Sequence, residues 1–170
     1  LADVSMSNLV NATAIGARTV VNNSNKIRLG NAAVTVIEGQ VPFTYPSDRN
    51  LKESFQPVDG EEVLSKIGGL SLTSWNYIGQ DAKQFRHYGP MAQDFFAAFG
   101  HDAIGTIGTD TTITSGDLDG ILMVAAQALE KRTVEQTKKI DTLTAENIEL
   151  KARLEALERM FAGYAQTKAE

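Results

Sequence analysis

Residues 121–162 read ILMVAAQALEKRTVEQTKKIDTLTAENIELKARLEALERMFA and contain neither proline nor glycine. A run of this length without either helix breaker predicts one long α-helix. We expect it to span 117–167 and to reach about 70 Å. Its first part is apolar nearly all round, which predicts that this part packs into a neighbouring domain.

The second part of the run repeats apolar residues with heptad spacing, which is typical of a coiled coil. Asn147 falls on a core position, where a buried amide fixes the register because it must meet another amide at the same level. The alternative is an amphipathic helix that packs on its own domain. The coiled coil is favoured because the helix is longer than the core that so small a domain can offer it. The a positions are Ile140, Asn147, Leu154 and Phe161, and the d positions are Leu143, Leu150, Leu157 and Tyr164.

Residues 1–46 are rich in Asn, Thr, Ser, Ala and Val, with short β-branched runs at 19–21 and 33–37 that predict strands. The motif NATAIG at 11–16 is echoed fourteen residues later by NKIRLG at 25–30. A fixed period indicates a β-solenoid, whose coils bury a face only against neighbouring coils or chains. The segment resembles the head repeats of trimeric autotransporter adhesins, and a loop-rich β segment with a chance echo is the alternative.

Residues 47–116 mix glycine, aromatic and charged residues, as expected of a small α+β domain. The pattern predicts a helix over 61–67 closed by Gly68 and Gly69, and a strand near 70–77. It also predicts a second helix over 91–99 and a short strand at 111–114. The whole chain is therefore expected to be α+β: a β-rich trimeric fibre segment (1–46), a mixed domain (47–116), and a long helix (117–170) that forms a trimeric coiled coil.

Composition excludes several classes of function. The 170 residues include no cysteine, which excludes disulfides, thiolate metal sites and a cysteine nucleophile. A net charge of −5 argues against nucleic-acid binding, and the absence of a long apolar run argues against a membrane span. The two histidines, His87 and His101, lie in no metal-binding spacing, so we expect neither a metal nor a cofactor.

The stretch 45–53 reads YPSDRNLKE and lies where the composition changes. Spacing alone predicts a linker or a turn with a helix cap at Ser47 or Asp48. However, Ser-Asp-x-x-Leu-Lys followed by a short helix resembles the opening motif of the self-cleaving intramolecular chaperone domains that end phage endosialidases and tail spikes. The resemblance continues in order to about residue 135, through VLSKI at 63–67, WNY at 75–77, RHYGPMAQD at 86–94, and DG at 119–120 with AAQAL at 125–129.

This resemblance implies a serine–lysine dyad in which Ser47 is the nucleophile and Lys52 the general base. A lysine acts as a base only in its neutral form, which burial in an assembled interface favours. Attack on the Pro46 carbonyl would cut Pro46–Ser47, whereas the family points to the Ser47–Asp48 bond, so both bonds stay open. His87 would orient the dyad or bind the reacting carbonyl, or else be structural. Gly89 would allow a close backbone approach.

The sequence therefore predicts a C-terminal chaperone that trimerises, templates folding of upstream fibre or spike domains of the same polypeptide, and then releases itself at Ser47. A chain that starts at Leu1 is consistent with a fragment of such a polypeptide. The mature fibre is expected in a virion tail or on a bacterial surface. The alternatives are a structural trimerisation tip that is not cleaved, and an oligomerisation unit of a transcription factor. The residues at 130–135 are no basic region, which disfavours the latter.

Overall fold

The computed structural model describes residues 1–167, with side chains as far as Ala162. The predicted d position Tyr164 therefore lies outside the described side chains. The chain divides into two compact units, Leu1–Ser54 and Phe55–Glu170, each of which is described by itself. The predicted α+β class with a long C-terminal helix is confirmed.

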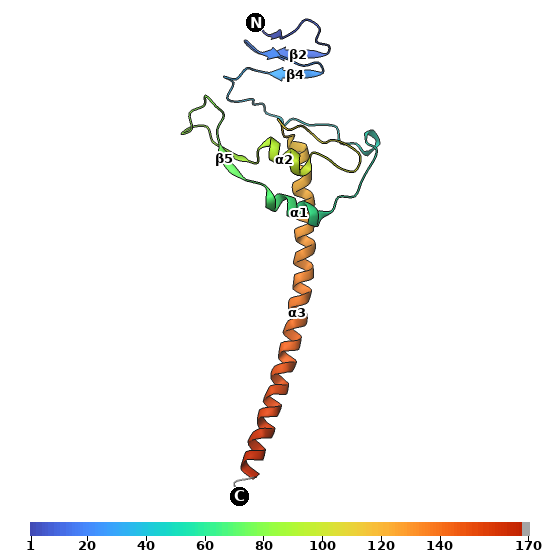
Figure 1. Cartoon of the computed structure of the whole chain (residues 1–170), viewed down its shortest axis with the longest axis vertical. Helices are drawn as coiled ribbons and strands as arrows, with labels where there is room; N and C mark the ends of the chain where they lie inside the picture. The colour runs from blue at the N-terminus through green and yellow to red at the C-terminus, as the bar shows by residue number, and fades with distance from the viewer. Residues whose placement is uncertain (168–170) are drawn as a thin grey trace. The chain divides into compact units, whose positions relative to one another are not determined.

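The first unit is built from short parallel strand pairs (Figure 1). The strands are β1 (Asp3–Val4), β2 (Ala12–Ile15), β3 (Val20–Val21) and β4 (Lys26–Leu29). Strand β1 pairs with β3, and β2 pairs with β4 so that Ala12 lies opposite Lys26 and Ile15 opposite Leu29. The fourteen-residue echo in the sequence thus becomes the register of a parallel ladder.

The corner before each of the strands β2 and β4 is made by an asparagine in the left-handed conformation. Asn11 has φ 53° and Asn25 has φ 56°, a region that asparagine tolerates better than most residues. The Nδ2 of Asn11 donates to the Oδ1 of Asn25 over 3.1 Å. Val21 of β3 and Thr19, just before that strand, are fully buried. Equivalent residues therefore stack on each other from one coil to the next.

Residues 33–37, which we expected to form a strand, contain none in the structure. A strand forms only where a neighbouring strand can hydrogen-bond its backbone N–H and C=O groups, and a β-branched sequence alone does not provide that neighbour. Val36 and Ile37 are exposed.

The second unit packs two short helices against the start of a long one, as Figure 1 shows. Its core consists of Val63, Phe95, Phe99 and Ala125. A two-stranded antiparallel hairpin pairs Thr73 with Gly89 and Trp75 with His87. The elements are α1 (Gly60–Gly69), β5 (Thr73–Trp75), β6 (His87–Gly89), α2 (Ala92–Phe99) and α3 (Ser115–Thr167).

Helix α1 begins at a carboxylate cap and runs further than the sequence predicts. Asp59 accepts a hydrogen bond from the backbone N–H of Glu61 over 2.8 Å. Gly68 and Gly69, expected to close the helix, lie inside it, and Leu70 is its C-terminal cap. Packing of Val63 on the core outweighs the weak helix propensity of glycine.

Helix α3 contains 53 residues and continues far beyond the point where α1 packs against it (Figure 1). The expected strand at 111–114 is instead a turn held by an isolated bridge between Thr109 and Thr112. Among the described residues, we find no helix apolar and long enough to cross a membrane.

Candidate functional site: the Ser47–Lys52 turn

The structure brings the side chains of Ser47 and Lys52 together. Lys52 Nζ donates a hydrogen bond to Ser47 Oγ over 2.7 Å. The two residues are five positions apart in the sequence, a spacing that no regular helix face joins. A local turn must therefore close the distance.

That turn is a short 3₁₀-helix, Arg49–Leu51, capped at its start by Asp48. Asp48 Oδ1 accepts from the backbone N–H of Asn50 over 2.9 Å and from its Nδ2 over 3.0 Å. The backbone N–H of Lys52 donates to the carbonyl of Arg49 over 3.2 Å, after which the chain is extended again. The cap and the turn together return Lys52 to Ser47.

The arrangement has the contact of a nucleophile with its base but, in the single chain, not the burial that the chemistry requires. A hydroxyl becomes an effective nucleophile when a base removes its proton. An amine does so only when neutral, and a water-excluded environment favours that form. Both Ser47 and Lys52 are exposed in the isolated chain.

The structure places His87 in an aromatic cluster of the second unit. Its ring centroid lies 4.7 Å from that of Trp75 and 5.6 Å from that of Tyr77. Gly89, two residues further along β6, has φ 151°, which side-chain-bearing residues rarely adopt. Among the described residues, no heavy atom other than those of Gly89 and its two chain neighbours lies within 4 Å of where its Cβ would be. The described ring contacts of His87 are thus with Trp75 and Tyr77, and the expected roles of His87 and Gly89 at the dyad stay predictions.

The predicted coiled-coil positions form an exposed apolar stripe on α3. Asn147, in the middle of the stripe, donates from Nδ2 to the carbonyl of Leu143 over 3.0 Å. In the single chain its amide is thus satisfied by its own helix. The exposed members are Ile140, Leu143, Leu150, Leu154, Leu157 and Phe161.

The residues at the start of the turn also begin a match to a known family. Residues 47–102 match the Peptidase_S74 family model, described as chaperone of endosialidase. This segment is an intramolecular chaperone domain. The match includes Ser47, Lys52, His87 and Gly89 of the chaperone domain, and the family's name implies a self-cleaving, peptidase-like domain. No curated protein matches the chain.

Sequence reasoning missed two features of the second unit. One is a bidentate contact of Glu61 with Arg132, seventy-one residues away along the chain. The other is a pocket beside Trp75, assembled from three separate segments. The concentration of aromatic residues around 75–88 was the available signal for the second. As for metals, no group of three or more ligand-type residues suited to an ion occurs in the described part of the chain.

Proposed function

We propose that the chaperone domain and α3 form a homotrimer, hold an upstream β fibre in register while it folds, and then release themselves by autoproteolysis beside Ser47. The observation that carries this proposal is the 2.7 Å contact between Lys52 Nζ and Ser47 Oγ, at the first residues of the family match.

In the proposed reaction, neutral Lys52 takes the proton of Ser47 Oγ while that oxygen attacks a carbonyl beside it. The peptide C–N bond breaks, the leaving amine takes up a proton, and water then hydrolyses the ester. Attack on the Pro46 carbonyl breaks Pro46–Ser47 through a five-membered ring. Cleavage of Ser47–Asp48 needs a different approach, and both remain open.

Assembly would supply what the single chain lacks. When the stripe at 140–157 packs against the same stripe of two further copies of the chain, apolar side chains that are exposed in the single chain become buried. Asn147 amides facing one another would then fix the register. Burial of the Ser47–Lys52 turn in the same assembly would favour the neutral amine, so that cleavage reports a correctly assembled fibre.

The first unit fits the role of the end of the fibre. Strands β2 and β4 pair in parallel at an offset of fourteen residues, and β4 pairs with no described strand other than β2. A solenoid rung with an open edge gains stability from further coils or chains. Because long-range parallel pairing is slow, joining three chains at a coiled coil would cut the entropy cost of starting it. Release would leave the fibre kinetically trapped, in a virion tail or on a cell surface.

A structural trimerisation tip that is never cleaved is the second candidate. It is favoured by the exposure of both dyad residues in the single chain. Apart from cleavage, this structural tip would have the same features as the self-cleaving chaperone.

The experiment is intact-mass measurement of the full chain after expression, with light scattering to count subunits. We expect two fragments divided beside Ser47, and an uncut trimer for Ser47→Ala and Lys52→Ala. Lys52→Arg is the matched control, because arginine keeps the positive charge but cannot act as a base. The two candidate bonds differ by one serine in the fragment masses. A trimer of the unaltered chain that stays whole would favour the structural tip.

A further inference from the structure

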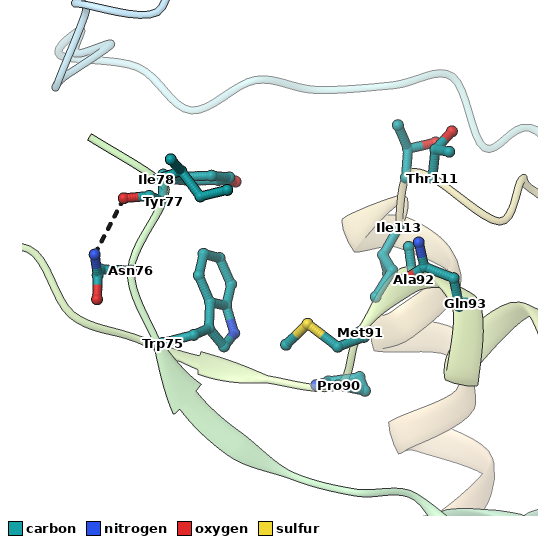
Figure 2. A pocket seen from close by; sticks show the side chains of 11 residues that line it. Trp75, Asn76, Tyr77, Ile78, Pro90, Met91, Ala92, Gln93, Thr111 and Ile113 are labelled. Atoms are coloured by element: carbon teal, nitrogen blue, oxygen red, sulfur yellow. Dashed lines mark hydrogen bonds between the residues drawn. The ribbon is translucent and has the colours of Figure 1, made fainter. Parts of the chain in front are cut away.

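An open pocket of about 560 Å³ lies between the β5–β6 hairpin and the start of α2. Its walls come from three segments, 75–78, 90–93 and 111–113, and all of its lining residues are uncharged. Figure 2 shows Trp75 on one side, facing Met91 and Ile113 on the other. Volume and composition are those of a site that binds an apolar ligand with a few polar groups.

One polar group of this pocket has no partner. The Nε1 atom of Trp75 is buried and makes no hydrogen bond. The edge of the indole that carries it is turned toward Met91 (Figure 2). A buried N–H without an acceptor is costly, and native proteins rarely leave one. Met91 is partly exposed and has a flexible side chain, so an incoming acceptor can displace it.

We propose that this pocket binds residues 41–46 of a second copy of the chain, with a backbone carbonyl of that segment accepting the hydrogen bond of Trp75. The inference rests on the proposed trimer and cleavage, and it assigns to the pocket the task of holding the peptide that precedes the cleavage site.

The segment 41–46 has the chemistry that such a pocket selects. It reads VPFTYP, carries no charge, and forms neither helix nor strand. Its two prolines favour an extended, polyproline-like backbone, both at the prolines and at the residues before them. Its apolar side chains are in solvent: Val41 is 79% exposed, Phe43 85% and Tyr45 66%. Aromatic-lined grooves that bind proline-containing segments are a recurrent mode of peptide recognition.

Such binding would give the dyad a fixed substrate. Pro46 adjoins Ser47, so a segment held at 41–46 restrains one of the bonds beside the nucleophile. Restraining the reacting groups removes an entropic part of the barrier. Since the pocket and the segment would belong to different copies, cleavage would require the neighbour.

The test uses the absence of native cysteine. Phe43→Cys and Ile113→Cys are combined on one chain, in the Ser47→Ala background, and the trimer is oxidised mildly. We expect covalent dimers and trimers on a non-reducing gel, and none from either cysteine alone. Phe43→Cys with Ile104→Cys is the control pair, because Ile104 is exposed but lies outside the pocket. A trimer with no disulfide at the first pair, or with disulfides only within single chains, would overturn the proposal.

A second variant tests the hydrogen bond. Trp75→Phe keeps an aromatic ring and removes the N–H, so we expect self-cleavage about threefold to tenfold slower. The yield of the Phe43–Ile113 cross-link should fall with it. Tyr88→Phe, on β6 but outside the pocket, should change neither. Full-rate cleavage in a Trp75→Phe trimer would defeat the pocket proposal and leave the proposed function standing, whereas a monomeric Ser47→Ala chain would defeat both.

Discussion

The contact of Ser47 with Lys52 depends on the side chain of Asp48, which has no chemical step in the proposed reaction. Asp48 accepts two hydrogen bonds from Asn50 and starts the 3₁₀-turn that brings Lys52 Nζ to 2.7 Å from Ser47 Oγ. A capping side chain of this kind stabilises a turn by roughly 1 kcal/mol. The turn is exposed, so the cap has little help from packing.

Asp48→Ala should therefore slow self-cleavage by about fivefold, the factor that corresponds to a cap of roughly 1 kcal/mol. The appearance of fragments is followed by intact mass after refolding. Asp48→Asn keeps an acceptor oxygen in the same place and should cleave at nearly the rate of the unaltered chain. Equal slowing by both substitutions would mean that the charge of Asp48, rather than its cap, matters.

The contact of Glu61 with Arg132 ties α1 to α3. Arg132 Nε donates to Oε2 of Glu61 over 2.9 Å and to Oε1 over 3.0 Å. Hydrogen bonding from Arg132 lowers the pKa of Glu61 below its ordinary value of 4.5 and raises the pKa of Arg132. A carboxyl whose pKa is lower in the folded state contributes stability above pH 4.5 and loses it as the pH falls through the lower value.

Glu61→Gln should accordingly flatten the loss of stability below pH 4.5, with a small effect because both side chains are exposed. The measurement is the denaturation midpoint between pH 3 and pH 7, roughly the range over which carboxyl groups titrate. Arg132→Gln removes the other partner and should flatten the profile in the same way. Identical profiles for the unaltered chain and both variants would exclude the pair as a source of acid sensitivity.

At the scale of elements, α1 approaches α3 closely at a glycine. A Cβ on Gly60 would lie 2.7 Å from the Cβ of Ala128, closer than non-bonded carbon atoms come in folded proteins. Gly60 is the first residue of α1, so the approach sets how the helix begins its contact with α3. Only a residue without a side chain fits there.

Gly60→Ala should lower the free energy of unfolding by about 1–3 kcal/mol, as overpacked positions do. The melting temperature of the Ser47→Ala background, followed by circular dichroism, measures the loss. Gly68→Ala in the same helix is the control, since nothing lies within 4 Å of its Cβ position. Alanine there should stabilise the helix by up to about 1 kcal/mol. A Gly60→Ala variant that melts like the unaltered chain would contradict the packing of α1 on α3.

Elements with a strong periodic signal could be predicted from the sequence, and those that depend on distant partners could not. The long helix follows from the absence of glycine and proline at 121–162 and from its heptads. The register of β2 with β4 follows from the fourteen-residue echo. By contrast, the β-branched run at 33–37 has no strand because propensity supplies no partner edge. Gly68 does not end α1 because packing on the core sustains the helix.

The candidate site, too, combines features that the sequence predicts with features that depend on tertiary structure. Resemblance singled out Ser47 and Lys52, but a separation of five residues does not by itself predict a contact. The contact depends on the 3₁₀-turn that Asp48 caps, which is local and in part predictable. The pocket at Trp75 was not predictable, because tertiary structure joins residues 75–78, 90–93 and 111–113.

At the scale of the whole molecule, the exposed apolar stripe and the residues that would react belong to different units of the chain. Leu143 and Leu150 lie on α3, in the unit Phe55–Glu170, whereas Ser47 and Lys52 belong to the unit Leu1–Ser54. If assembly supplies the burial that the dyad needs, then a substitution in the stripe must reduce cleavage even though Ser47 and Lys52 are unaltered. A dyad that works in the single chain would show no such dependence.

Leu143→Asp with Leu150→Asp places two charges on the seam of the proposed coiled coil, where three helices would bring like charges together. We expect light scattering to report monomers and intact mass to show an uncut chain, although Ser47 and Lys52 are unchanged. Ile148→Asp is the matched control, because Ile148 is equally an exposed apolar residue of α3 but lies off the heptad seam. That variant should remain trimeric and cleave. Fragments from a monomeric double variant would show that cleavage does not require assembly, and the burial of Lys52 would then have to come from its own chain.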